Sequence, residues 1–155
     1  MSKAASEALE SLLGEGSVDQ VVSDCVALVN EEVAKKRGLS AVVIKGGLKV
    51  VSKIRPNILN DLFYSLLPSF VEKVAPLYDR FIELDEGTRG SFASYLSVHS
   101  SELASLLLEV TDRRAQVSKL GALVKVYQKL RPLAQEQIVG AVPALGTLLA
   151  KHGVR

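Results

Sequence analysis

The sequence predicts an all-α fold, a single-domain helical bundle of about seven to eight helices. Apolar residues recur at three- and four-residue spacings along nearly the whole chain, and no sustained alternation of period two occurs. The chain has 155 residues, of which 48% are hydrophobic, so one domain over residues 1–155 can bury a sizeable core. One cysteine excludes a disulfide scaffold, and the apolar content excludes a disordered chain.

Glycines and capping residues predict where the helices begin and end. An N-terminal helix is expected over residues 4–13, and Gly14 ends it. Ser17 and Gln20 have the spacing of a capping box for the next helix, and Ser40 is expected to cap the helix after that. Later helices are expected at residues 57–67, 91–96, 103–114, 118–130 and 133–151.

The five prolines are expected to divide the chain further. Proline lacks a backbone N–H and clashes with the preceding helical turn, and the residue before it is pushed out of the α region. Arg55-Pro56 and Arg131-Pro132 are therefore predicted to be corners between helices. A new helix is expected to begin at Pro68, with a kink or break at Pro76 and an interruption at Pro143.

Two segments of the chain resemble each other at an offset of 76 residues. Lys49–Pro56 (KVVSKIRP) shares five of eight residues with Lys125–Pro132 (KVYQKLRP), and each segment precedes an apolar helix with a second proline. We infer two repeated three-helix units, arranged about a pseudo-twofold axis or stacked. Because two units are fewer than a solenoid needs, a closed bundle is favoured. The two units span about residues 17–86 and 91–152.

The net charge of +2 conceals an alternation along the chain. Residues 1–34 carry −6, residues 35–60 carry +7, residues 61–112 carry −6 and residues 113–155 carry +7. Each repeated unit thus joins an acidic first part to a basic middle helix. This near balance, with no Trp and few other aromatic residues to stack on bases, argues against a nucleic-acid partner.

The repeated basic residues are the weak candidates for anion or partner contact. Four lysines share the polar faces of two helices, and an arginine precedes each predicted corner, where a helix N-terminus attracts anions. A structural role is favoured, because cations near a helix C-terminus complement the helix dipole by about 0.3–1 kcal/mol and can pair with the acidic helices. The candidates are Lys49, Lys53, Arg55, Lys125, Lys129 and Arg131.

The sequence offers no catalytic or metal-binding constellation. His99 and His152 lie far apart and have no ligand partners at helical spacing. Cys25 falls on an apolar stripe and is expected in the core. Asp79 and Glu83 belong to an acidic cluster that is expected to be a solvated face. We therefore expect no enzyme activity, no metal and no cofactor.

Several short motifs resemble those of a known family. They are the two K-V-x-x-K-[Ile/Leu]-R-P elements, Leu67-Pro68, Val142-Pro143 and the segment Leu107–Arg114. Together they resemble a bacterial family of small all-helical proteins that carries a domain-of-unknown-function label. The resemblance covers almost the whole chain. It implies an all-α fold and brings no activity, cofactor or site residues.

The expected function is therefore non-enzymatic. We expect a helical protein that acts through protein–protein contacts, with a homodimer among the arrangements considered. The alternative is a carrier of an apolar or anionic lipid-like ligand. The apolar helices at residues 58–67 and 137–150 are expected to form the buried centre of the bundle. If they do not, they would line a ligand cavity or expose a stripe that makes a homodimer.

The sequence also predicts a cytoplasmic protein. The first ten residues lack the apolar region of a signal peptide. The longest uncharged stretch, residues 137–150, is shorter than the roughly 20 residues that a transmembrane helix needs. No membrane-spanning segment is therefore expected, and one free cysteine suits a reducing compartment.

Overall fold

The computed structural model describes residues 3–155, with side chains from Glu7 onward. Within that range the chain forms seven α-helices, one short 3-10 helix and no strand, which confirms the predicted all-α class and number of helices. The helices are α1 (Lys3–Glu10), α2 (Val18–Lys35), α3 (Leu39–Ile54), α4 (Ile58–Ile82), α5 (Phe92–Val98), α6 (Ser100–Val117) and α7 (Gly121–Lys151). The 3-10 helix, Ser11–Leu13, follows α1 directly.

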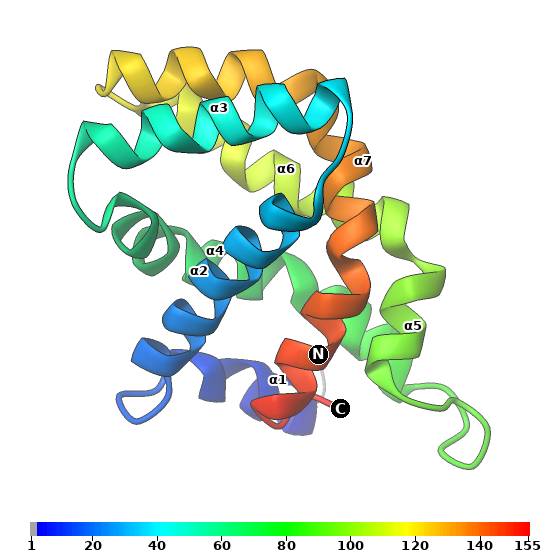
Figure 1. Cartoon of the computed structure of the whole chain (residues 1–155). Coiled ribbons are helices and arrows are strands. Elements are labelled where there is room, and N and C mark those ends of the chain that lie inside the picture. Colours follow the sequence, from blue (N-terminus) through cyan, green and yellow to red (C-terminus); the bar gives the residue numbers. More distant parts are fainter. Residues whose placement is uncertain (1–2) are drawn as a thin grey trace.

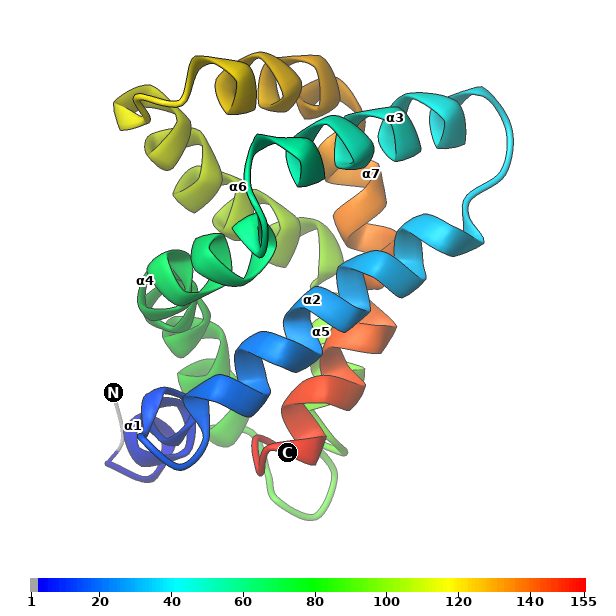
Figure 2. The ribbon, with the colours of Figure 1, turned by 60° about the vertical axis from the view of Figure 1, so that its left-hand side comes forward.

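The helices form a bundle with a two-helix layer at one end (Figure 1). At that end α3 and the first part of α7 lie side by side and run in opposite directions, as Figures 1 and 2 both show. Below this layer, α2 and α6 each pack against α4 and α7, and α5 packs closely on α7. Both termini lie at the opposite end of the molecule from α3 (Figure 2).

The core is centred on α4, α5 and the helices around them. Tyr78 and Phe81 of α4 meet Phe92 of α5, and the rings of Tyr78 and Phe92 pack edge to face with centroids 4.7 Å apart. Such edge-to-face pairs add about 0.5–1.5 kcal/mol to the burial of apolar surface. Cys25 of α2 packs against this core as predicted, and burial raises the pKa of its thiol to about 11.

Most prolines do not end helices in this fold. Pro56 does lie at a corner, since α3 ends at Ile54 and Asn57 takes the left-handed conformation (φ 60°) before α4 begins. The predicted corner at Arg131-Pro132 is wrong, because Pro132 lies inside the continuous helix α7. A new helix does not begin at Pro68, and the chain does not break at Pro76 or Pro143.

The position of these four prolines explains why the helices continue. A proline costs a helix about 3 kcal/mol and leaves one carbonyl without its N–H partner. All four prolines inside helices are exposed: Pro68, Pro76, Pro132 and Pro143. The carbonyl that each proline leaves without a partner belongs to the residue four positions earlier, on the same face of the helix. That face is turned toward water. The opposite faces bury apolar residues that offset the loss, such as Leu67, Val71 and Val74 in α4.

Pro132 is nevertheless associated with a change of direction. In both views α7 bends sharply between its yellow first part and its orange-red second part (Figures 1 and 2). The first part lies beside α3, and the second part contributes Val142, Leu148 and Leu149 to the buried interior. The helix bends where a corner was predicted, without interrupting its helical backbone. The internal duplication itself stays a prediction.

The two predicted N-caps differ in outcome: Ser17 does lie at the N-cap position directly before α2, but its capping box does not form, and the cap at Ser40 is wrong. The side chain of Ser17 makes no capping hydrogen bond, and Gln20 donates to Asp24 instead. Ser40 lies inside α3, which begins one residue earlier after Gly38. A cap that was not predicted forms at Ser91, whose hydroxyl oxygen accepts from the backbone N–H of Ser94 at 3.1 Å.

Candidate functional site

The structure brings together four of the six candidate residues on two neighbouring helices. Lys49 and Lys53 lie on α3, and Lys125 and Lys129 lie on the adjoining part of α7. The two helices pack closely, because a Cβ added to Gly47 of α3 would lie 2.9 Å from Leu130 Cδ1 of α7. Segments that are 76 residues apart in the sequence therefore form one end of the molecule.

These four lysines are exposed and make no ion pair with any described residue. The expected pairing with acidic helices is therefore not made by the lysines. The two candidate arginines do pair. Arg55 Nε lies 3.3 Å from Asp61 Oδ2 in the first turn of α4, and Arg131 binds Asp112 of α6. The six candidates thus divide into four free cations and two structural ones.

Arg131 joins α7 to α6 beside the bend. Its Nε and Nη2 donate to the two oxygens of Asp112 at 2.8 and 3.1 Å, and the Tyr127 hydroxyl also donates to Asp112. These hydrogen bonds, chiefly the one from Arg131, hold the pKa of Asp112 below its usual value. Burial and the neighbouring Asp112 carboxylate raise the pKa of Tyr127 to about 12. These contacts of Arg131 and Tyr127 with Asp112 hold α7 against α6, and they do not expose a charged group that could bind a ligand.

The free cations extend beyond the four candidates. No acidic residue occurs in residues 33–60 or 113–135, which include α3 and the first part of α7. Each exposed cation there therefore lacks a compensating charge from its own segment. We call the surface formed by eight exposed, unpaired cations the basic end. Its residues are Lys45, Lys49, Lys53, Arg113, Arg114, Lys119, Lys125 and Lys129.

Large apolar side chains stand among these cations. On α3, Leu39 is 88% exposed, Val42 is 70% exposed and Val50 is 48% exposed. Helical spacing places Val42 on the same side of α3 as Lys49 and Lys53. Val117 and Leu120, which connect α6 to α7, are also exposed. The presence of exposed aliphatic side chains beside the lysines of α3 was not predicted from the sequence.

The opposite end of the molecule carries more exposed carboxylates than cations, although Lys151 and Arg155 lie there too. It includes α1, the loop that follows it and the loop between α4 and α5, all distant from α3 in both views (Figures 1 and 2). Five exposed carboxylates lie there. We call these residues the acidic end: Glu7, Glu15, Glu83, Asp85 and Glu86. The alternation of charge along the sequence thus becomes a separation of charge in space.

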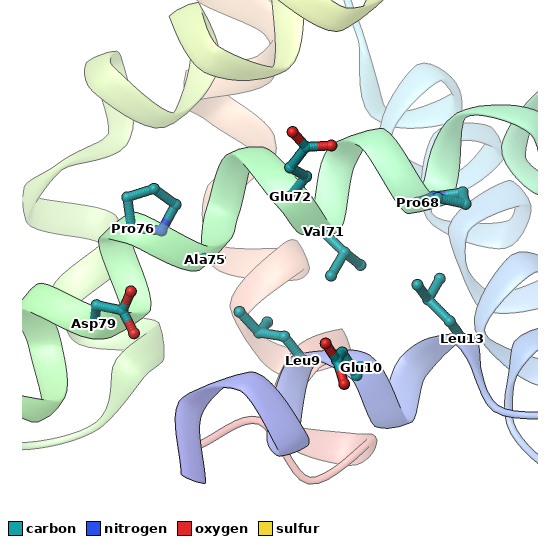
Figure 3. A pocket seen from close by; sticks show the side chains of 9 residues that line it. All are labelled: Leu9, Glu10, Leu13, Pro68, Val71, Glu72, Ala75, Pro76 and Asp79. Atoms are coloured by element: carbon teal, nitrogen blue, oxygen red, sulfur yellow. The ribbon is translucent and has the colours of Figure 1, made fainter. Parts of the chain in front are cut away.

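A groove of about 440 Å³ lies between α1 and α4 (Figure 3). Its apolar wall includes Leu9, Leu13 and Val71, and the carboxylates of Glu10 and Asp79 also line it. Asp79 Oδ1 is buried there without a hydrogen-bond partner, so the predicted solvated face does not include that atom. Carboxylates in the wall oppose the binding of an anionic lipid-like ligand in this groove.

The two histidines do not meet. His99 Nδ1 lies 3.8 Å from Glu102, whereas His152 Nε2 lies 2.7 Å from Asp24 Oδ2. Lys151 Nζ also binds Asp24, at 2.9 Å, so this cluster joins the end of α7 to α2. This cluster could not be found from residue spacing, because 128 residues separate Asp24 from His152. Among the described residues, no group of His, Cys, Asp and Glu could hold a metal ion.

Helix α7 is long and apolar enough to cross a membrane by length and composition alone. The core helix of a bundle has the same properties, and part of α7 does belong to the core. No curated protein and no solved structure has significant similarity to the chain. A family model matches residues 9–153, nearly the whole chain, and its description gives no activity. The chain therefore belongs to the family of unknown function DUF6918.

Proposed function

We propose that this is a non-enzymatic binding protein that acts through macromolecular contacts made by its basic end. The observation that carries the proposal is the gathering of eight exposed cations without acidic partners. A folded domain that used these cations for its own stability would pair them, as it pairs Arg131 with Asp112. Unpaired cations gathered on one surface attract an anionic partner and increase its rate of association.

Two alternative functions, a homodimer and an internal carrier of a lipid-like ligand, fit the structure less well. A symmetric homodimer places the same surface of two copies together, and two basic ends would repel each other. An internal carrier of a lipid-like ligand would need an apolar cavity free of opposing charge, and the described groove has acidic residues in its wall. A larger anionic partner therefore fits better than a second copy or an enclosed ligand. A cytoplasmic location stays a prediction.

Site-specific photo-crosslinking in living cells tests this proposal. A benzophenone amino acid replaces Gln128, which is exposed on α7 between Lys125 and Lys129. The matched control carries the same group at Thr88, an exposed position in the loop at the acidic end. The proposal predicts crosslinked adducts, to protein or to lipid, from position 128 and at most a background level from position 88.

Gel mobility and mass spectrometry of the purified chain detect both kinds of adduct. Equal crosslinking from the two positions would show that the basic end is not a preferred contact surface. The absence of any adduct from position 128 would contradict the proposal in the same way. Adducts that form only between copies of this chain would restore the homodimer.

A further inference from the structure

We propose that the basic end docks onto the surface of an anionic lipid membrane, with α3 lying along the interface. This inference rests on the proposed function and names the partner. The exposed side of α3 alternates lysines with large aliphatic residues and contains no acidic residue. A helix at a membrane interface needs both components, because lysines interact with anionic headgroups while aliphatic side chains enter the boundary of the acyl region.

The charge on this surface is sufficient for an interfacial role. Lys45, Lys49 and Lys53 recur every four residues along α3. Lys125 and Lys129 lie on the adjoining part of α7. None of these five lysines has an ion pair among the described residues, so none must give up a partner to meet a headgroup. Each basic residue near an anionic membrane is worth about a fivefold change in partition.

The exposed aliphatic residues distinguish a membrane from other polyanions. Leu39, Val42 and Val50 stand out from α3, and nothing in the described structure covers them. Duplex nucleic acid presents phosphates to a basic surface and gives such side chains no apolar environment. Single strands are bound largely by stacking on aromatic rings, and α3 contains no aromatic residue. A lipid interface accommodates the lysines and the aliphatic side chains together.

The separation of charge between the two ends of the molecule supports an orientation in which the basic end faces the membrane. The basic end and the acidic end lie at opposite ends of the bundle (Figure 2). Near a negatively charged surface, such a molecule turns its cations toward the surface and its carboxylates away. Helix α3 and the first part of α7 together form the outermost layer of the basic end, so this orientation brings both helices to the membrane (Figure 1).

Vesicle co-sedimentation of the full chain tests the inference. The vesicles are phosphatidylcholine with and without phosphatidylglycerol, and heparin and a DNA duplex serve as polyanions without an apolar phase. We expect the wild type to bind the anionic vesicles and not the neutral ones. Lys49→Glu should weaken this binding at least about fivefold. Arg155→Glu makes the same charge change at the opposite end and should leave binding near wild type.

A second variant separates lipid from other polyanions. Leu39→Ser/Val42→Ser keeps every charge and changes two exposed side chains that the fold does not bury. It should bind anionic vesicles about tenfold more weakly, because burial of one aliphatic side chain is worth at least that factor, and bind heparin as the wild type does.

Three results would overturn the membrane inference: no binding to anionic vesicles, unchanged vesicle binding by the double serine variant, or tighter binding to the duplex than to the vesicles. If crosslinks from position 128 to a protein or nucleic acid accompany any of them, the proposed function stands and only the partner is wrong. If position 128 yields no adduct at all, both proposals fail.

Discussion

At the residue scale, Gly146 is required by the close approach of α7 to α5. A Cβ at this position would lie 2.7 Å from the Cβ of Ala93, a distance that packed atoms do not tolerate. We predict that Gly146→Ala lowers the free energy of unfolding by about 1–3 kcal/mol, through overpacking. Urea denaturation measures the change, and Ala93→Gly in the same chain should recover part of the loss.

Gly140 provides the matched control, since it lies six residues earlier in the same helix. It is exposed, and an added Cβ would meet only Lys36 Nζ, at 4.0 Å. Gly140→Ala should therefore raise the free energy of unfolding by about 0.5–1 kcal/mol, because alanine loses less backbone entropy in a helix. If both alanine variants destabilise the protein equally, the contact between α5 and α7 is not the cause.

Asp24 makes stability depend on pH in the acidic range. Hydrogen bonds from Lys151 and then from His152 and Gln20 outweigh partial burial and lower the pKa of Asp24 from 3.8 to about 2. Because the folded-state pKa is the lower one, the ionised carboxylate stabilises the fold above about pH 4, and this contribution disappears as the pH falls toward 2. Its size is about 1–2 kcal/mol.

The variant Asp24→Asn tests this assignment. Urea denaturation between pH 6 and pH 2 gives the difference in unfolding free energy from the wild type. We expect a less stable variant at pH 6 and a difference that shrinks below about pH 4. A difference that stays constant over the whole range would show that the carboxylate charge is not responsible.

At the element scale, Arg131 fixes the bent helix α7 against α6. A lysine keeps the charge but cannot make the two parallel hydrogen bonds to Asp112. Both side chains are more than a third exposed, so solvent screens the pair. We predict that Arg131→Lys lowers the free energy of unfolding by about 0.5–1 kcal/mol, measured by urea denaturation.

Arg55→Lys is the control for this prediction. Arg55 meets Asp61 through a single contact of 3.3 Å, and both side chains are about half exposed. The change should stay within about 0.5 kcal/mol of wild type, as for other surface substitutions. Equal losses at both positions would contradict a special role for the pair beside the bend.

The sequence predicts the elements of this fold better than their boundaries. Helical periodicity is a property of whole segments, so the class and the number of helices are confirmed. The proline rules fail at Pro68 and Pro132 because they describe a helix in isolation. In the folded chain the burial of the opposite face offsets the lost hydrogen bond. Ser40 fails as a cap for a related reason, since a single residue pattern does not determine where a helix begins. Ser17 does lie directly before α2, but its side chain makes no capping hydrogen bond.

The candidate site could also be predicted only in part from the sequence. Spacing alone places Lys49 with Lys53 and Lys125 with Lys129, because residues four apart share a helix face. Only the tertiary packing of α3 on α7 brings the two pairs to one end of the molecule. The ion pairs of Arg55 and Arg131 likewise depend on where Asp61 and Asp112 fold. Helical spacing places Val42 with the lysines of α3, whereas the exposure of Val50 could not be predicted, since a helical stripe does not reveal which apolar residues find a partner.

At the scale of the whole molecule, the alternating charge of the sequence becomes a basic end and an acidic end. Five cations of the basic end lie on the adjoining helices α3 and α7, and three lie in the last part of α6 and the loop after it, whereas five exposed carboxylates lie at the far end of the bundle. Charges separated in this way act on a partner together, and salt weakens their effect. We therefore expect a partner to cover the basic end in the cell.

Lysine acylation in intact cells, compared with the purified chain, tests that claim most directly. Mass spectrometry gives the extent of labelling at Lys49, Lys53, Lys125 and Lys129, with Lys35 as an exposed lysine outside the basic end. We predict that the four lysines are clearly less reactive in cells than in the purified protein, whereas Lys35 is equally reactive in both. Equal reactivity of the four lysines in cells and in the purified protein would contradict the account.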